Sequence, residues 1–222
     1  MLIAGIAGNE GNVKTASLIN SILVSKGKKV SIIDSASLQG LDAKRIRAYI
    51  NELRKINVDV LILKITLSDI EKCFYDDIKF DIVIYTDKAE KYYDADNNDT
   101  TAGNGYSRSF SFLGESGIAI VNVDDNELIS LLQGKKQKFV TYGFNTKASI
   151  TTSSIGDALY KDGFICCLQR TISDYHGRAI EPQEYKLKLD TDNMDAHSVL
   201  AAASFAIVNG IDLNSYNGVI TM

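Results

Sequence analysis

The chain alternates between short, continuous apolar runs and longer segments in which apolar positions recur every three or four residues. The runs at 2–7, 58–65 and 80–86 are typical of strands buried on both faces of a parallel sheet. Between the first run and another at 29–33, the spacing predicts a helix that ends at Gly27, which suits a C-cap. A strand, a helix and a strand in about 33 residues form a βαβ unit. The apolar face of this helix is expected to comprise Val13, Ala16, Ile19, Ile22, Leu23 and Val24.

The alternation continues to about residue 143 and then changes. A helix is expected over 43–56, and further strands over 117–123 and 138–142. After Gly143, three apolar segments follow one another without a helical pattern between them, which is typical of antiparallel strands. These segments are 149–155, 163–172 and 185–189. A final helix with an Ala-rich centre is expected over 194–208.

These elements predict an α/β fold, in which a doubly wound, mostly parallel sheet of P-loop type carries a small antiparallel subsheet in its C-terminal third. We expect a single domain over 1–222. Within it, 1–145 would form the α/β core, 146–192 the antiparallel subsheet and 193–222 the closing helix. The polar stretch from Lys88 to Ser116 is expected to be a loop.

Composition narrows the classes of function. The chain has 222 residues, 45% of them hydrophobic, so it can bury a sizeable core. A net charge of -4 argues against a nucleic-acid-binding surface. The sequence has neither the pattern of a signal peptide nor the roughly 18 apolar residues of a membrane span, so we expect no membrane contact. Three cysteines predict neither a disulfide framework nor a zinc site, which fits a protein of the reducing cytoplasm.

The segment after the first strand has the composition of a phosphate-binding loop. It reads Gly-Asn-Glu-Gly-Asn-Val-Lys-Thr from Gly8 to Thr15, and it joins a buried strand to a helix, where backbone amides can bind phosphate. The pattern G-x-x-x-x-G-K-[ST] fits Gly8, Lys14 and Thr15 but puts Val13 where the second glycine belongs. Valine does not readily adopt a positive φ, so in this register the usual loop conformation is not expected.

From Gly5 to Val30 the chain resembles the Mur ligases, in particular the UDP-N-acetylmuramoyl-tripeptide synthetases, whose loop reads G-x-[TA]-G-T-N-G-K-[ST]-[ST]-T. The ungapped match keeps Gly5, Gly8, Gly11, Thr15, Leu18, Ile19, Gly27, Lys28 and Val30. In this register the resemblance puts Asn12 at the position of the phosphate-binding lysine and Val13 at that of the hydroxyl on the magnesium side. The nucleotide site that it implies comprises Gly8, Gly11, Asn12, Lys14 and Thr15.

The side chains at these positions change the expected chemistry. An asparagine carries no charge to offset the β- and γ-phosphates, and a valine offers magnesium no oxygen. We therefore expect ATP and Mg²⁺ to bind weakly or not at all, and we assign no metal ligands. Lys14 would supply the missing charge if the loop repacks.

Other segments that resemble the family keep some positions and change others. The strand that ends in a magnesium-binding glutamate in the family has Lys64 at that position, where a cation repels the metal. The family's T-N-L-x-x-D-H-L-D segment keeps Thr86 and Asp94. Its Asn, Asp and His are replaced by Asp87, Lys91 and Tyr92. The region around 106–113, where the family carries a carbamylated lysine, contains no lysine.

The best-preserved segments lie later in the chain. The family's N-x-D-D is present as Asn122, Asp124 and Asp125, and its Y-G as Tyr142 and Gly143. The helix H-N-x-x-N-x-L-A-A keeps its last three residues, at 200–202. Its polar positions are occupied by Met194, Asp195 and Ser198. Positions that shape the fold are thus retained, while most of those that would touch ATP or metal differ.

The resemblance covers the family's central domain alone, without the domains that bind the UDP-sugar and the amino acid, so stand-alone ligase activity is not expected. Two hypotheses follow. The first is a degenerate nucleotide-binding or regulatory module, a pseudoenzyme partner of cell-wall peptide ligases. The second is a subunit of a split ATP-dependent amide ligase or ATPase, with Lys14, Thr15 and Asp87 in altered roles. Either would act with a protein that supplies the missing domains, or with a second copy of the chain.

Overall fold

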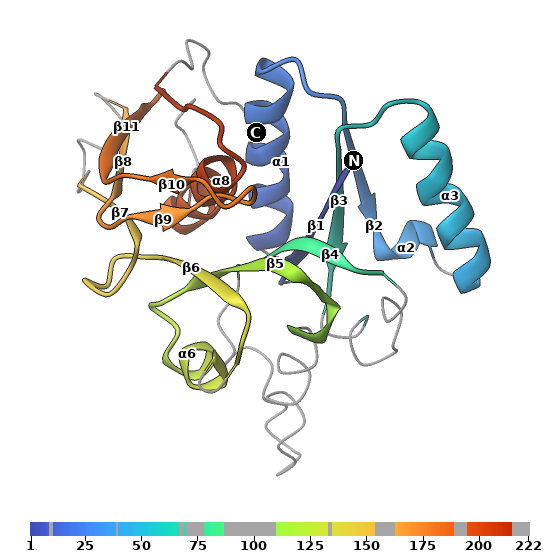
Figure 1. Ribbon diagram of the computed structural model, residues 1–222, viewed down its shortest axis with the longest axis horizontal. Helices are drawn as coiled ribbons and strands as arrows, with labels where there is room; N and C mark the ends of the chain where they lie inside the picture. The colour runs from blue at the N-terminus through green and yellow to red at the C-terminus, as the bar shows by residue number, and fades with distance from the viewer. Residues whose placement is uncertain are drawn as a thin grey trace.

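The computed structural model describes residues 1–8, 11–38, 40–66, 69, 78–86, 110–132, 135–153, 163–188 and 195–214. A nine-stranded sheet runs through this part of the chain in the order β11-β8-β7-β6-β5-β4-β1-β3-β2 (Figure 1). Its strands are β1 (Leu2–Ala7), β2 (Val30–Asp34), β3 (Val60–Ile65), β4 (Phe80–Tyr85), β5 (Leu113–Asn122), β6 (Lys138–Tyr142), β7 (Ile150–Thr152), β8 (Phe164–Leu168) and β11 (Gln183–Leu187). Neighbouring strands from β2 to β7 pair in parallel, and β8 and β11 continue the sheet antiparallel. The predicted α/β sheet with an antiparallel edge is confirmed.

Helices cover both faces of the sheet, as the doubly wound prediction requires. On one face, α1 (Gly11–Ser25) and α8 (Ala196–Val208) lie side by side (Figure 1). On the other face lie α3 (Ala43–Lys55), the short α2 (Ser35–Leu38) and α6 (Asn126–Leu132). Alternate residues of each central strand point to the two faces, so each strand contributes to both cores.

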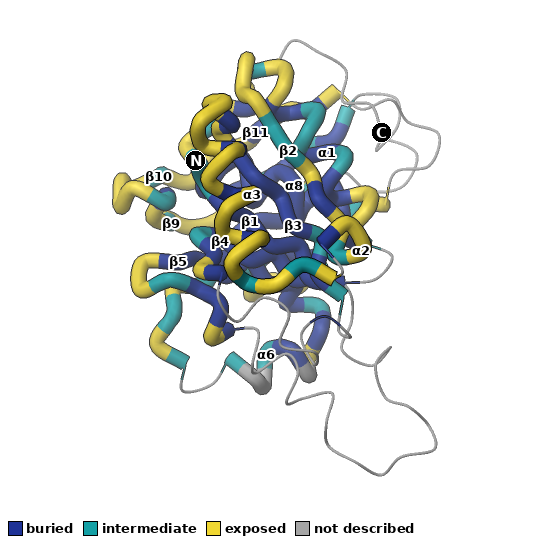
Figure 2. Tube along the Cα trace, turned by 90° about the vertical axis from the view of Figure 1, so that its right-hand side faces the viewer, coloured by how far each residue is buried: buried dark blue, intermediate teal, exposed yellow. Residues whose placement is uncertain are grey.

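The central strand β1 is buried on both sides. Ile6 and Ala7, which point to opposite faces, are 0% and 1% exposed. Gly5 leaves room for its neighbours, because a Cβ there would lie 2.7 Å from the Ile65 side chain and 3.1 Å from the Phe80 ring. Figure 2 shows the buried strands behind α3, whose outer side is exposed. The continuous apolar run at the amino terminus was therefore interpreted correctly.

The predicted apolar face of α1 is correct for four of its six residues. Ala16, Ile19, Ile22 and Leu23 are buried, but Val13 and Val24 are 54% and 55% exposed. Eleven residues are close to three full turns, so these two valines share one side of the helix, away from the buried stripe.

Other predicted boundaries differ from the structure. The expected loop at 88–116 is wrong at its end, because Phe110–Phe112 forms a 3-10 turn with both rings buried and β5 already begins at Leu113. Residues 87–109 lie outside the described part. The expected strand at 163–172 is two elements: β8 ends at Leu168, and Ile172 begins a separate two-stranded sheet. That sheet pairs β9 (Ile172–Ser173) with β10 (Ala179–Ile180).

The final helix begins two residues later than expected. Asp195 is its N-cap, with a carboxylate that accepts hydrogen bonds from the backbone nitrogens of His197 and Ser198. Eleven of the thirteen residues of α8 are buried. Among the described helices, none is long and apolar enough to cross a membrane. The division at residues 145 and 192 stays a prediction.

Candidate functional site

The parallel strands bring five loop starts to one edge of the sheet. Gly8, Thr66, Thr86, Val123 and Gly143 each follow directly after β1, β3, β4, β5 and β6. The Gly8 nitrogen donates to the Ile65 carbonyl at 3.0 Å, and the Thr86 nitrogen donates to the Ala7 carbonyl at 3.0 Å. Ligands of open α/β sheets bind at this carboxyl edge, so the candidate site lies here.

The helix start distinguishes between the two sequence registers of the phosphate loop. α1 begins at Gly11, so Val13 lies within its first turn. Asn57 is the one non-glycine residue with a positive φ in the described part of the chain. Val13 therefore does not need a glycine-like conformation, and the objection raised by the G-x-x-x-x-G-K-[ST] register does not apply. Gly8 has a φ of 154°. Asn9 and Glu10, which complete the loop, lie outside the described residues.

The Asn12 side chain points toward the loop and donates a hydrogen bond to its backbone. Its side chain is 4% exposed, and Nδ2 donates to the Gly8 carbonyl at 2.5 Å. The position that the resemblance assigns to a phosphate-binding lysine thus carries a neutral amide, which is already used within the loop. This contact could not be read from the sequence, because it depends on the backbone path between Gly8 and Gly11.

The other two predicted side chains point in different directions. Lys14 is exposed, and Thr15 is fully buried, with a hydroxyl that has no hydrogen-bond partner among the described residues. The first turn of α1 contains no acidic residue, so its N-terminus stays compatible with an anion. Of the predicted set, Gly8, Gly11, Asn12 and Thr15 lie at or inside the loop and Lys14 outside it.

Lys64, at the position that the resemblance assigns to a magnesium-binding glutamate, forms an ion pair. Its Nζ lies 2.5 Å from Oδ1 of Asp34, and its side chain is 19% exposed. The next loop is closed by Asp69, whose Oδ2 accepts from both the nitrogen and the hydroxyl of Thr66. Two other changed positions, Asp195 and Ser198, lie at the start of α8, where the Ser198 hydroxyl donates to Oδ2 of Asp195 at 2.8 Å. The remaining changed positions, Asp87, Lys91, Tyr92 and Met194, lie outside the described residues, as does Asp94.

Asp124 is the centre of a second cluster at the same edge. Its carboxylate accepts from the backbone nitrogens of Phe144 and Asn145, each at 2.8 Å, and lies 3.0 Å from Nε2 of His197. Burial alone would raise the pKa of Asp124, but the hydrogen bonds from Phe144, His197 and Asn145 outweigh it and hold the pKa below its ordinary value. We did not predict the part that His197 plays in this cluster.

The aromatic side of the cluster faces outward. The Phe144 ring stands edge-on to the His197 ring, with centroids 4.7 Å apart, and Phe144 is 52% exposed. The remaining residues of N-x-D-D have local roles. Asn122 accepts from the Asp124 nitrogen, and Asp125 accepts from the Leu128 nitrogen at the start of α6. Asp124 is thus the residue that joins this motif to α8, through His197.

Residues 6–177 match the family model of the Mur ligase middle domain. No curated protein matches the chain by sequence.

Solved structures with a similar fold include ligases of cell-wall and folate metabolism. UDP-N-acetylmuramoyl-L-alanyl-D-glutamate–2,6-diaminopimelate ligase superposes with a TM-score of 0.70 at 16% identity, over 96% of this chain and 44% of that one. UDP-N-acetylmuramoylalanyl-D-glutamyl-2,6-diaminopimelate–D-alanyl-D-alanyl ligase of Acinetobacter baumannii gives a TM-score of 0.63 at 14% identity, over 98% of this chain and 46% of that one. Folylpolyglutamate synthase/dihydrofolate synthase of Yersinia pestis, complexed with AMPPNP and Mn, gives 0.63 at 12%, over 96% and 55%. The chain thus spans about half the length of the structures it matches.

Proposed function

Because the chain belongs to the Mur ligase family, through the middle domain that residues 6–177 match, we propose that it is a ligase-derived module with a degenerate nucleotide site. Its role would be that of a binding or regulatory partner of cell-wall peptide ligases. The observation that carries this proposal is the hydrogen bond from Asn12 to the Gly8 carbonyl.

Asn12 disfavours ATP in two ways. Its amide carries no charge to offset the β- and γ-phosphates, and its side chain lies against the loop where phosphate oxygens would approach. Binding would require this buried contact to break. The remaining cation of the turn, Lys14, is exposed and would have to reach back over the loop.

Lys64, at the position that the resemblance assigns to a magnesium ligand, also disfavours a magnesium–ATP complex. Magnesium prefers oxygen ligands, and the Lys64 ammonium brings a positive charge to the place of a carboxylate. Its partner Asp34 neutralises that charge without leaving a net negative site. The described residues therefore do not fit a magnesium–ATP complex.

The exposed side chains at this edge support contact with a protein. Val13 and Phe144 are large apolar residues, 54% and 52% exposed, and both lie where the β-strands end. A partner chain that covered these two side chains would gain apolar contact area.

Calorimetric titration with ATP and Mg²⁺ tests the nucleotide part. We expect no binding at millimolar ATP, and measurable binding by the double variant Asn12→Lys/Lys64→Glu, whose fold is checked by circular dichroism. Micromolar binding by the unaltered chain that is lost in Lys14→Ala would overturn the proposal.

The partner role is tested by light scattering with two purified ligases from the organism of this chain. These are UDP-N-acetylmuramoyl-L-alanyl-D-glutamate–2,6-diaminopimelate ligase and UDP-N-acetylmuramoylalanyl-D-glutamyl-2,6-diaminopimelate–D-alanyl-D-alanyl ligase. A complex that is weakened at least tenfold by Phe144→Ser, and unaffected by Tyr49→Ser on the far side of the sheet, is expected. If neither ligase associates with the chain at micromolar concentration, the partner role fails.

The alternative is a subunit of a split ATP-dependent amide ligase or ATPase. It is favoured by Lys14, which is exposed in the first turn of α1, and by the intact cluster of Asp124 and His197 at the same edge. This alternative requires phosphate release from ATP above background, dependent on Lys14, in the presence of a chain that carries the flanking ligase domains. Background release in that mixture excludes it.

A further inference from the structure

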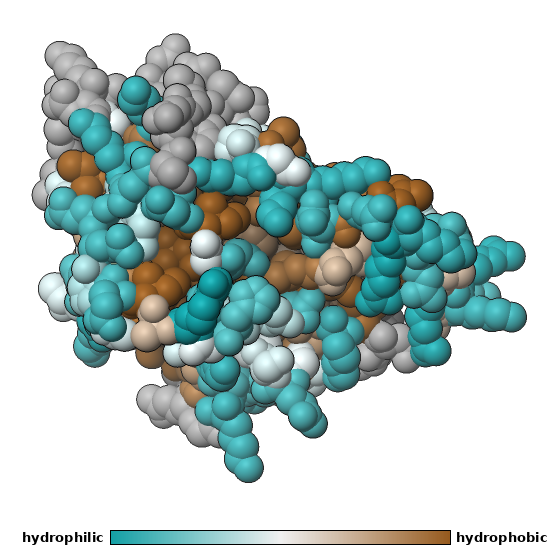
Figure 3. Space-filling view, turned by 45° about the horizontal axis from the view of Figure 1, so that its top comes forward, coloured by the Kyte–Doolittle hydropathy of each residue, from teal (hydrophilic) through white to brown (hydrophobic). Residues whose placement is uncertain are grey.

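A pocket lies at the opposite, amino edge of the sheet, where the C-terminal end of α8 meets β11 and the β9–β10 hairpin. It encloses about 490 Å³. Figure 3 shows apolar side chains gathered in a hollow among hydrophilic ones on one face of the molecule. The pocket shares no residue with the phosphate loop or with the Asp124 cluster.

Arg178 lies at one end of this pocket, with a side chain that is 68% exposed and paired with Asp174. Its Nε donates at 2.6 Å to Asp174, whose side chain is 2% exposed, and Oδ1 of Asp174 accepts from the Arg178 nitrogen at 2.8 Å. Gly210 lies directly beside the guanidinium, since a Cβ there would be 2.7 Å from Nη2. In the described part of the chain no hydrogen bond uses the two terminal nitrogens. These form the face with which arginine binds a carboxylate in bidentate fashion.

The Asp174–Arg178 pair also closes the turn between β9 and β10, since the Asp174 nitrogen donates to the Arg178 carbonyl. That turn would be closed by the backbone contacts and by Nε alone. The terminal nitrogens are not needed for it, so their position at the pocket is a separate feature.

A second polar group points into the pocket from the other end. Tyr185 is 3% exposed, lines the pocket, and its hydroxyl has no hydrogen-bond partner in the described structure. Burial raises its pKa to about 12, with Cys166 and Asp212 adding to the effect, so the hydroxyl is protonated and able to donate at neutral pH. The Tyr185 hydroxyl is not among the fully buried polar atoms of the described residues, so a ligand in the pocket can accept a hydrogen bond from it.

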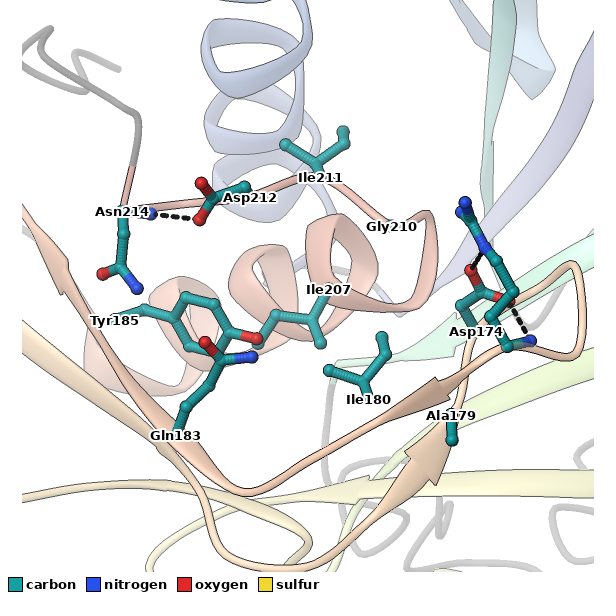
Figure 4. Close-up of a pocket in the computed structure, with 11 residues that line it drawn as sticks. Asp174, Ala179, Ile180, Gln183, Tyr185, Ile207, Gly210, Ile211, Asp212 and Asn214 are labelled. Carbon is teal, nitrogen blue, oxygen red and sulfur yellow. Dashed lines mark hydrogen bonds and ion pairs between the residues drawn. The ribbon is translucent and has the colours of Figure 1, made fainter.

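The two ends are separated by an apolar wall. Figure 4 shows Tyr185 and Gln183 on one side and Asp174 on the other, with Ile180 and Ile207 between them. Ile211 adds to the same wall. An occupant that satisfies these groups has an anion at one end, an apolar body, and a hydrogen-bonding group at the other end.

We propose that this pocket binds a small amphipathic carboxylate, with its anion on Arg178, its apolar body against Ile180 and Ile207, and a distal polar group on Tyr185. Asp212 also lines the pocket, so we expect a monocarboxylate to bind more tightly than a ligand with a second negative charge. The site is independent of the nucleotide edge, so its test and the ATP titration can succeed or fail separately.

Three probes of one skeleton test the proposal on the full chain: 4-hydroxyphenylacetate, phenylacetate and tyramine, titrated by protein-observed NMR. We expect 4-hydroxyphenylacetate to bind with a submillimolar Kd and to shift the amide signals of residues 178–185 and 207–214. Tyramine, with an ammonium in place of the carboxylate, is expected to bind at least tenfold more weakly. Millimolar tyramine binding equal to that of the acid would overturn the proposal.

Variants assign the two ends. Tyr185→Phe is expected to weaken 4-hydroxyphenylacetate several-fold and to leave phenylacetate unchanged, a difference that a merely structural role would not produce. Arg178→Gln is expected to abolish binding of both acids, whereas Arg170→Gln, outside the pocket, is expected to preserve it. Retained binding of the acids by a folded Arg178→Gln variant would refute the site. So would the absence of binding of either acid to the unaltered chain at a 10-fold molar excess over millimolar protein.

Discussion

Nε2 of His197 lies 3.0 Å from Oδ2 of Asp124, and this contact joins the first turn of α8 to the loop that follows β5. The two residues are 73 positions apart in sequence. Because the same carboxylate also accepts from the Phe144 and Asn145 nitrogens, one side chain fixes α8, β5 and the loop after β6 relative to one another. The carboxyl edge is therefore organised around Asp124.

Asp124→Asn is expected to lower the free energy of unfolding by about 1 to 2 kcal/mol at pH 7, since hydrogen bonds to a charged acceptor are lost. The pKa of Asp124 in the folded protein lies below its ordinary value of 3.8, so its contribution is present above that value and lost as pH falls through the folded pKa. Urea unfolding at pH 7, 5 and 3.5 measures this.

Glu115→Gln, on the exposed start of β5, is the matched control and is expected to change stability little at any of these pH values. A difference between Asp124→Asn and the unaltered protein that stays constant down to pH 3.5 would contradict the role given to the ionised carboxylate.

Asn12→Ala is expected to destabilise the protein by about 1 to 2 kcal/mol, because the buried Gly8 carbonyl loses its donor. Asn20→Ala in the same helix makes the same change in helix propensity at a half-buried position, so it isolates the contact. Thermal unfolding of both variants gives the comparison. Equal melting temperatures would mean that the Asn12 amide does not close the loop.

Thr15→Val removes a fully buried hydroxyl that has no partner, and it keeps the shape of the side chain. We expect unchanged or increased stability, by up to about 1 kcal/mol. Thr152→Val, which removes a hydroxyl that donates to the Ile165 carbonyl at 2.7 Å, should by contrast destabilise the protein. Chemical denaturation measures both. A clear loss of stability in Thr15→Val would show that its hydroxyl has a partner.

Tyr142→Phe is expected to cost about 1 to 3 kcal/mol. The Tyr142 hydroxyl in β6 donates to the Tyr85 carbonyl in β4 at 2.8 Å, across the intervening strand β5. Both side chains are 0% exposed. Tyr49→Phe, on the outer side of α3 and 42% exposed, is the control and should be near neutral. Comparable midpoints for the two variants in guanidinium unfolding would argue against a bond between β6 and β4.

The strands could be predicted where they are buried on both faces, because a continuous run such as Ile82 to Ile84 has no other stable environment in a protein this size. The exposed Val13 and Val24 could not be predicted, since α1 has apolar residues on more than one side and spacing alone does not identify the buried stripe. Phe110 and Phe112 were missed because the polar stretch before them concealed a turn that packs inward.

The candidate site could be predicted only as far as local sequence determines it. The strand, loop and helix around Gly8 follow from neighbouring residues, and so does the identity of the side chains there. The pairing of Asp124 with His197 and of Lys64 with Asp34 depends on the order of strands, which no local pattern encodes. The motif around Asp124 and the start of the last helix were the only sequence signals for the first pair.

The position of β1 has a consequence for how the chain folds during synthesis. β1 is made before both of its neighbours in the sheet, which are β3, beginning at Val60, and β4, beginning at Phe80. Until the ribosome has released β3 and β4, the segment Leu2 to Ala7 cannot pair on both sides or become fully buried. Non-local pairing of this kind is slow. The nascent β1 segment is therefore expected to need protection by chaperones until β4 has been made.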